Sequence, residues 1–285
     1  MKRVVAKVKH FAELVAFSHT IFSVPFIFIA MFTAARGLPS LKILGLGILA
    51  AVFARNFAMG FNRYADRKFD ALNPRTAGRP SVDGRVGVSS MLAFLVLNAL
   101  GFILVSFFIN PLAFYLSFAF LPILAGYSLF KRFSPSAHLI LGLSLALAPI
   151  AGAIAVLSAV PLWAYALSLG VLFWVAGFDV LYSLQDIEFD SKHGLFSIPS
   201  RFGVKFSLNI AFVFHMLTVL FWAVFVKFAA LGAFATLAVF ISAVLLSYEH
   251  YLVRKDFAKI DKAFFTVNGW LGVVFLIFVV LDLLF

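Results

Sequence analysis

The stretch Val86-Gly-Val-Ser-Ser-Met-Leu-Ala-Phe-Leu-Val-Leu-Asn-Ala-Leu-Gly-Phe-Ile-Leu-Val-Ser-Phe-Phe-Ile109 contains no charged side chain. An α-helix rises about 1.5 Å per residue, so a helix of this length would cross the bilayer hydrocarbon core, which is about 30 Å thick. Comparable apolar stretches occupy residues 11–35, 41–61, 86–109, 111–130, 137–159, 161–182, 206–228, 230–253 and 263–285. They lack the alternation of apolar and polar residues that a barrel strand needs. We therefore predict an all-α integral membrane protein with nine transmembrane helices.

The composition supports this prediction. Hydrophobic residues make up 64% of the 285 residues and charged residues 12%, and the mean hydropathy is +1.07, which excludes a soluble domain with a polar surface. The absence of cysteine excludes disulfides and thiolate sites. Because the connections between the expected helices are short, we predict one transmembrane domain over residues 1–285, with two polar motif loops at 62–85 and 179–205. The first apolar stretch is too long for a signal-peptide core, so it is expected to be a retained helix.

The distribution of charge predicts the orientation. The net charge is +11, and placing the N-terminus in the cytoplasm puts 20 of the 23 Lys and Arg residues on the cytoplasmic side of the nine expected helices. This bias sets membrane topology, so we expect a cytoplasmic N-terminus in a multi-pass protein of the cytoplasmic (inner) membrane. A basic excess on the membrane surface predicts contact with anionic lipid head groups and phosphates, and no nucleic-acid partner is expected.

Polar side chains recur at helical spacing in two places. The first ladder is Asn62, Asp66 and Asp70, and the second ladder is Asp179, Tyr182, Asp186 and Asp190. Residues three or four apart share a helix face, so each ladder is expected on one face. Grouped carboxylates repel one another unless a cation screens them, and Mg²⁺ combines a few carboxylates with water and phosphate oxygens. We therefore predict a Mg²⁺ site, open to the cytoplasm, that binds a diphosphate.

The two ladders are spaced evenly along the chain. Asp66 and Asp186 are 120 residues apart, as are Asp70 and Asp190. An internal duplication would explain this spacing, with four expected helices in each half and the ninth as an addition. The repeat is weak outside the ladders, so independent origins of the two halves remain an alternative.

The ladders and their following loops resemble the two signatures of the UbiA superfamily of intramembrane prenyltransferases. The first ladder is followed by Asn73-Pro-Arg-Thr76, and the second by Ser197-Ile-Pro199 and Arg201-Phe-Gly203. The resemblance covers essentially the whole chain. It implies a polyprenyl diphosphate held by two Mg²⁺ ions between the ladders, with the metal ligands Asn62, Asp66, Asp70, Asp186 and Asp190.

Basic residues near the ladders are candidate contacts for the diphosphate. Lys131 follows Tyr127 by four residues and so resembles a Tyr-x-x-x-Lys run whose lysine, in the family, binds diphosphate. The further candidates are Arg63, Arg67, Arg75 and Arg132. Asn62 is a candidate both for binding the substrate and for binding the metal. Each of these basic residues alone could instead serve only to mark the cytoplasmic side or to stabilise a loop.

Asp179 and Tyr182 precede the other acids of the second ladder and should lie deeper in the membrane. We expect them to be catalytic, with Asp179 orienting the acceptor hydroxyl or taking a proton from the acceptor ring. A structural hydrogen bond is the alternative. Relatives that use aromatic acids often carry Arg or Lys near position 16, where this chain has Ala16, so His19 is the candidate substitute for binding a substrate carboxylate. A histidine that only packs in the bundle is the alternative.

The resemblance implies that a polyprenyl group is transferred from polyprenyl diphosphate to an aromatic acid of the 4-hydroxybenzoate type in quinone biosynthesis. A dihydroxynaphthoate acceptor in menaquinone biosynthesis is the alternative acceptor. A secondary transporter is the alternative from another class, because transporters also combine many helices, internal repeats and membrane acids.

Overall fold

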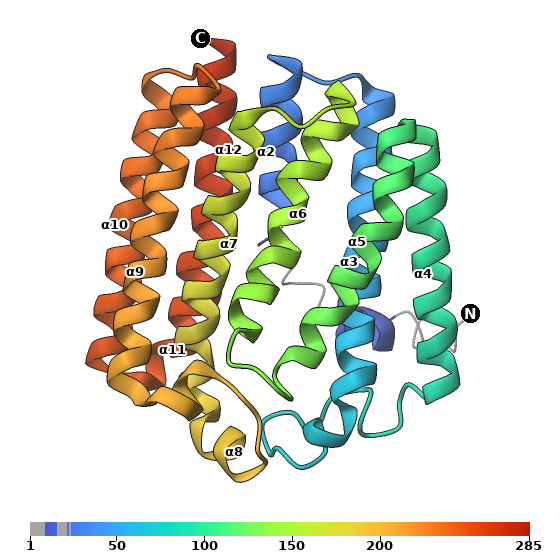
Figure 1. The fold of residues 1–285 in the computed structure, drawn as a ribbon, viewed down its shortest axis with the longest axis vertical. Helices are drawn as coiled ribbons and strands as arrows, with labels where there is room; N and C mark the ends of the chain where they lie inside the picture. The colour runs from blue at the N-terminus through green and yellow to red at the C-terminus, as the bar shows by residue number, and fades with distance from the viewer. Residues whose placement is uncertain (1–8, 16–21, 23) are drawn as a thin grey trace.

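The computed structural model describes residues 9–15, 22 and 24–285, and those residues form helices, turns and loops without a strand. The α-helices are α2 (Val24–Ala35), α3 (Leu41–Asp70), α4 (Val88–Ile109), α5 (Pro111–Phe130), α6 (Ala137–Leu157), α7 (Leu162–Tyr182), α8 (Ile187–Lys192), α9 (Ile198–Phe228), α10 (Ala233–Lys255), α11 (Ile260–Lys262) and α12 (Asn268–Leu284). The long helices run along the long axis of the molecule, and both motif loops lie at the same end, near α8 (Figure 1).

Helix α7 lies at the centre of the bundle, between α6 and α9. Glycines let the neighbouring helices approach it closely. A Cβ atom on Gly142 of α6 would lie 2.3 Å from the carbonyl oxygen of Leu172, and one on Gly170 would overlap the ring of Trp222 at 2.2 Å. Larger residues would therefore push α6 and α9 away from α7. This close packing holds the end of α7, which carries Asp179, in a defined place.

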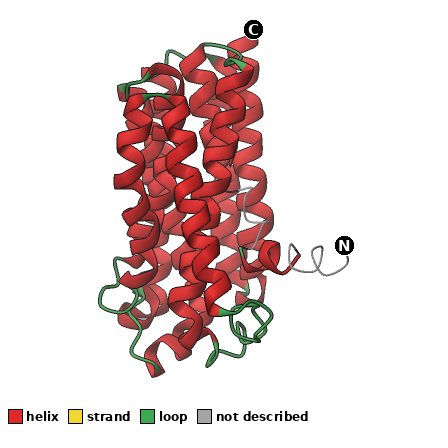
Figure 2. Ribbon diagram, turned by 90° about the vertical axis from the view of Figure 1, so that its right-hand side faces the viewer, coloured by secondary structure: helices red, strands yellow, loops and turns green. Residues whose placement is uncertain are grey.

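Eight helices of the described residues are long and apolar enough to cross a membrane. Helix α2 is shorter, and the part of the first expected span that precedes it falls largely outside the described residues. Many outward-facing side chains are apolar, as in Leu97 and Phe240, which suits contact with lipid tails. The structure therefore confirms a helical bundle, seen from the side in Figure 2, while the count of nine spans stays a prediction.

The second ladder does not lie on one helix, so that prediction was wrong. Helix α7 ends at Tyr182, a 3-10 turn covers Ser183–Asp186, and α8 begins at Ile187. The Ser183 hydroxyl donates to the Val180 carbonyl oxygen at 2.9 Å, an interaction that competes with regular helix. A 3-10 turn has three residues per turn, which changes the direction of Asp186 relative to Asp179. The first ladder, in contrast, lies on the continuous helix α3, which runs nine residues beyond the predicted apolar span.

Candidate active site

The first ladder lies on the last turns of α3, and its members contact one another. The Asn62 Nδ2 atom donates to Asp66 Oδ2 at 2.9 Å and to Ser128 Oγ of α5 at 3.4 Å. Arg63 Nη1 in turn donates to Asn62 Oδ1 at 3.1 Å. The amide of Asn62 is therefore held from three sides, and it orients the carboxylate of Asp66.

The loop after α3 folds back onto the end of the first ladder. Thr76 Oγ1 donates to the carbonyl oxygen of Asp70 at 2.9 Å, and Arg79 Nη1 pairs with Asp70 Oδ1 at 2.6 Å. The other carboxylate oxygen of Asp70, Oδ2, is buried and has no hydrogen-bond partner among the described residues. A buried, unpaired carboxylate oxygen is costly, so this atom is suited to a cation.

Arg75, from the same loop, joins the two ladders. Its Nη2 and Nε atoms bind the two oxygens of Asp186 at 2.6 and 3.2 Å, and its Nη1 donates to Tyr182 Oη at 3.1 Å. Asn73 Nδ2 adds a donor to Asp186 Oδ1 at 3.2 Å. Burial works against the charged form of Arg75, but the Asp186 carboxylate outweighs it and raises the pKa of Arg75. The first motif loop therefore fixes the position of Asp186.

Lys131 caps the end of α5 and faces the second ladder. Its Nζ atom lies 3.4 Å from Oδ2 of the buried Asp190. Burial acts to lower the pKa of Lys131, but the carboxylates of Asp190, Asp179 and Asp186 outweigh this effect and raise it. Lys131 is therefore a cation at neutral pH.

Two further arginines near the first ladder differ in position. Arg132 Nη2 lies 3.4 Å from Asp66 Oδ1 and donates to the carbonyl oxygen of Ala65 at 2.8 Å. Arg67 instead packs over the ring of Tyr64, with its Cζ atom 5.3 Å from the ring centroid, and is outside the cavity lining. Arg67 follows Asp66 by one residue, so its side chain leaves the helix about 100° away from that of Asp66. The prediction that Arg67 lies at the site is not supported by its position.

Asp179 has a partner that the sequence reasoning missed. Its Oδ2 atom lies 2.6 Å from Nδ1 of His138, a completely buried residue near the start of α6. His138 Nε2 faces the backbone N–H of Ile198 at 3.2 Å. The side chain of Asp179 is 24% exposed and lines the cavity between the ladders, where the ring of Phe178 lies next to it along α7.

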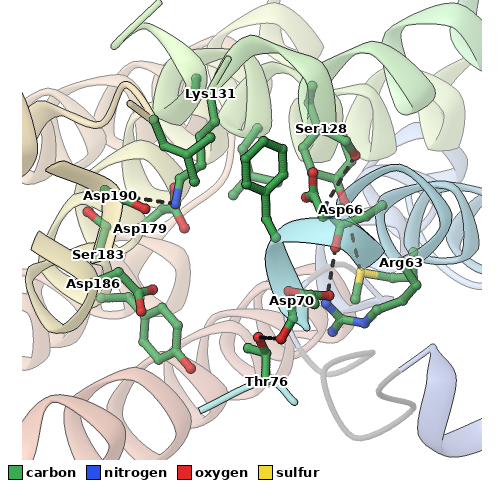
Figure 3. A pocket seen from close by; sticks show the side chains of 18 of the residues that line it. Arg63, Asp66, Asp70, Thr76, Ser128, Lys131, Asp179, Ser183, Asp186 and Asp190 are labelled. Atoms are coloured by element: carbon green, nitrogen blue, oxygen red, sulfur yellow. Dashed lines mark hydrogen bonds and ion pairs between the residues drawn. The ribbon is translucent and has the colours of Figure 1, made fainter. Parts of the chain in front are cut away.

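The cavity between the ladders has a volume of about 290 Å³. Figure 3 shows Lys131, Asp179 and Asp190 on one wall and Asp66 and Asp70 on the opposite wall. A second cavity of about 140 Å³ is lined mainly by apolar residues of α2 to α6. The two cavities share the lining residues Arg55, Met59, Tyr127, Leu141 and Leu145. A charged chamber therefore adjoins an apolar one.

The donor set fits Mg²⁺. Among the described residues, no three acidic or histidine side chains lie close enough together to form a ready-made metal site. The acids are instead divided between two walls, one with Asp66 and Asp70 and the other with Asp179, Asp186 and Asp190. Mg²⁺ binds through one or two carboxylates together with water and substrate phosphates, so it does not require an all-protein cage. The unpaired Oδ2 of Asp70 is an oxygen ligand of the required kind.

The cavity brings together most of the predicted site residues. These are Asn62, Arg63, Asp66, Asp70, Arg75, Lys131, Arg132, Asp179, Tyr182, Asp186 and Asp190. His19 lies outside the described residues. The sequence reasoning did not single out His138, Ser128 or the amide of Asn73 for the contacts they make. His138 carried a usable signal, because an ionisable residue within an apolar helix is functional by default.

Comparison with known proteins is consistent with this geometry. The family model for the UbiA prenyltransferase family matches residues 23–279. Two proteins named 4-hydroxybenzoate octaprenyltransferase, from Aeromonas hydrophila and Aeromonas salmonicida, are 33% and 34% identical over 257 residues, which is 90% of this chain and 88% of each relative.

Solved structures agree with these relatives. The apo structure of a UbiA homolog from Aeropyrum pernix K1 is 31% identical, with a TM-score of 0.84 over 93% of this chain and 98% of that one. A UbiA homolog from Archaeoglobus fulgidus bound to DMAPP and Mg²⁺ is 20% identical, covers 96% of this chain and 98% of its own, and shares the fold at a TM-score of 0.76. These matches support an enzyme and not a transporter. The chain belongs to the UbiA prenyltransferase family.

Proposed function

We propose that this protein transfers a polyprenyl group from polyprenyl diphosphate to an aromatic acid of the 4-hydroxybenzoate type, in quinone biosynthesis. The observation that carries the proposal is the charged cavity, in which two walls of paired acids and bases face each other beside an apolar chamber. A diphosphate suits the first space and a polyprenyl chain the second. The names of the relatives at 33% and 34% identity support the same reaction.

The cavity walls are proposed to bind the diphosphate. Mg²⁺, held by Asn62, Asp66, Asp70, Asp186 and Asp190, would neutralise the charge that grows on the departing diphosphate. Arg75, Arg79, Lys131 and Arg132 now pair with those acids, and each can donate to a phosphate oxygen. Cations fixed in place before the reaction stabilise the leaving group without having to reorganise.

The reaction breaks the allylic C–O bond and forms a bond between the allylic carbon and the aromatic ring. The ring faces of Phe178 and Phe264, which line the cavity beside Asp179, would stabilise the allylic cation. The ring carbon that forms the new bond then loses its proton. We propose that Asp179 takes this proton and that Tyr182, held by Arg75, orients the acceptor.

The acceptor carboxylate needs a cation to hold it. Arg63 lines the cavity and lies among buried groups, where it donates to Asn62 and to the carbonyl oxygen of Leu14. We propose Arg63 as a contact of the acceptor or the diphosphate, and His19 stays a prediction for the carboxylate. A fixed carboxylate would hold the ring close to the allylic carbon, which is the main requirement for this bond formation.

We also propose that the chain is a single domain with nine membrane crossings, a cytoplasmic N-terminus and a site that opens to the cytoplasm. The bias of Lys and Arg and the gathering of both motif loops at one end support this topology. Because the chain has no cysteine, single substitutions can test it cleanly. In spheroplasts, a membrane-impermeant thiol reagent should label Ala159→Cys, in the α6–α7 connection, and should spare Ala258→Cys, next to α10. The reverse pattern would overturn the orientation.

The function is tested with purified protein in liposomes, Mg²⁺, a series of prenyl diphosphates and a panel of acceptors. The panel contains 4-hydroxybenzoate, a dihydroxynaphthoate and phenol, and mass spectrometry identifies the products. We expect a prenylated 4-hydroxybenzoate, with phenol a poor acceptor. A preference for the dihydroxynaphthoate would indicate that the enzyme acts in menaquinone biosynthesis. Absence of any prenylated product, with intact folded protein, would overturn the proposal.

A further inference from the structure

His138 is a completely buried, ionisable residue that does not line the cavity. It lies in the first turn of α6 and contacts Asp179, which does line the cavity. Both of its ring nitrogens have partners: Nδ1 lies 2.6 Å from Asp179 Oδ2, and Nε2 lies 3.2 Å from the backbone nitrogen of Ile198. An ionisable group inside the protein is expensive to bury, and one of its two contacts, Asp179, lines the cavity.

The partners of the ring determine where its proton lies. The backbone N–H of Ile198 can only donate, so His138 Nε2 must be an unprotonated acceptor. A neutral imidazole then carries its proton on Nδ1, and this N–H donates to Asp179 Oδ2. A proton on Nε2 would instead face the Ile198 N–H and lose that hydrogen bond. The geometry therefore requires the Nδ1–H tautomer and a carboxylate oxygen that accepts.

We propose that His138 is a positioning residue for Asp179. The inference rests on the proposed function, in which Asp179 takes the proton from the acceptor ring. The hydrogen bond occupies Oδ2, which leaves Oδ1 as the atom that receives the proton. The step balances because the allylic C–O bond breaks, the diphosphate leaves with that electron pair, the ring forms the new C–C bond, and the ring proton moves to Oδ1.

The same contact links Asp179 to the second motif loop. Ile198 is the first residue of α9, and Ser197 precedes it with a side chain that accepts from the backbone N–H of Ser200. In the same loop, the backbone N–H of Phe196 donates to the carbonyl oxygen of Lys131 at 2.6 Å. The second motif loop therefore holds both the main chain of Lys131, through Phe196, and the imidazole ring of His138, through Ile198.

Two substitutions separate the hydrogen bond from the bulk of the ring. His138→Leu fills a similar volume but cannot donate to Asp179, whereas His138→Gln can donate to Asp179 and accept from the Ile198 N–H. We expect His138→Leu to lower kcat by about 10- to 100-fold, the range that a misplaced catalytic group costs. The KM for prenyl diphosphate should stay near the wild-type value, and His138→Gln should recover most of kcat. His215→Gln, at a buried histidine of α9, is the matched control and should leave kcat near wild type.

A double-mutant cycle with Asp179→Asn tests whether His138 acts through Asp179. If it does, His138→Leu causes no further loss of kcat in the Asp179→Asn background. Equal fold-losses in both backgrounds would overturn the proposal, as would an inactive His138→Gln protein that still folds. Binding of farnesyl thiolodiphosphate with Mg²⁺, measured by the shift of Tm, should be the same for wild type and His138→Leu. A lost shift would indicate general damage to the site and would also count against the proposal.

A second measurement does not depend on the acceptor or on turnover. Solid-state NMR of the ¹⁵N-histidine-labelled protein reports which ring nitrogen carries the proton, and the signal that His138→Gln removes identifies His138. We expect the neutral Nδ1–H tautomer in the wild type and a changed Nδ1 signal in Asp179→Asn. The Nε2–H tautomer or a doubly protonated ring would refute the positioning role. If the wild type shows the expected tautomer but prenylates no aromatic acid, the proposed function fails while the His138–Asp179 contact stands.

Discussion

Replacing Lys131 by alanine removes the cation that faces the second ladder. In the structure its Nζ atom lies 3.4 Å from Oδ2 of Asp190, whose side chain is 2% exposed. A hydrogen bond to a charged group contributes roughly 1.5–3 kcal/mol, and 1.4 kcal/mol corresponds to about tenfold in affinity. The KM for prenyl diphosphate should therefore rise by about 10- to 100-fold. The upper end is expected, because the substitution also leaves the negative charge of Asp190 unbalanced beside the diphosphate.

The assay measures initial rates of prenyl transfer in liposomes, with each substrate varied at a saturating concentration of the other. The KM for the aromatic acceptor should change little, since Lys131 pairs with Asp190, a proposed ligand of the Mg²⁺ that binds the diphosphate. Lys131→Arg keeps the charge and should retain most of the affinity. Lys68→Ala, which removes an exposed cation outside the cavity lining, is the matched control. Equal effects on both substrates, or no effect, would mean that Lys131 serves only membrane orientation.

The remaining predictions concern the metal, the prenyl chain and the bundle. Chelation by EDTA, or Asp66→Asn or Asp186→Asn, should abolish transfer while the protein still inserts and folds, since an amide lacks the charge that holds Mg²⁺; near-normal turnover in either variant would contradict the two-walled site. Ala54→Phe fills the apolar chamber and should shorten the longest prenyl diphosphate used, as read from product masses; an unchanged chain-length profile would place the chain elsewhere. Asn268→Leu removes the 2.8 Å hydrogen bond to the buried Glu249, so it should lower the unfolding free energy by about 1–3 kcal/mol in detergent, and an unchanged Tm would argue against that contact.

Much of the fold could be predicted from the sequence because the bilayer restricts the choices. A backbone that crosses hydrocarbon must satisfy its own hydrogen bonds, so long apolar stretches become helices. The expected spans 111–130 and 161–182 match α5 and α7 closely. The ends were harder to place, since α3 continues through the polar first ladder to Asp70. In this polar extension of α3, the Asn62 amide donates to the Asp66 carboxylate one turn further on.

The candidate site could be predicted to the level of its acids. Their regular spacing indicates a helix face. Asn62 and ten other predicted site residues line one cavity. The spacing also led to one wrong prediction, that the second ladder lies on a single helix, because a 3-10 turn at Ser183–Asp186 divides it. Arg75 reaches across from the first loop to hold Asp186, a contact between residues 111 positions apart. Such contacts are not encoded in local periodicity.

The sequence by itself determined that this chain is a helical membrane protein with two acidic motifs, since hydropathy and helical spacing are local properties. Only the tertiary structure decided which groups become partners. His138 and Asp179 are 41 residues apart and meet because α6 packs against α7. Arg63 and Arg67 lie four residues apart on α3, but only Arg63 lines the cavity. Arg63 donates to Asn62 and to the carbonyl oxygen of Leu14, whereas Arg67 packs over the ring of Tyr64. Packing fixes these positions, and a hydrogen bond or ion pair depends on them to within a few tenths of an ångström.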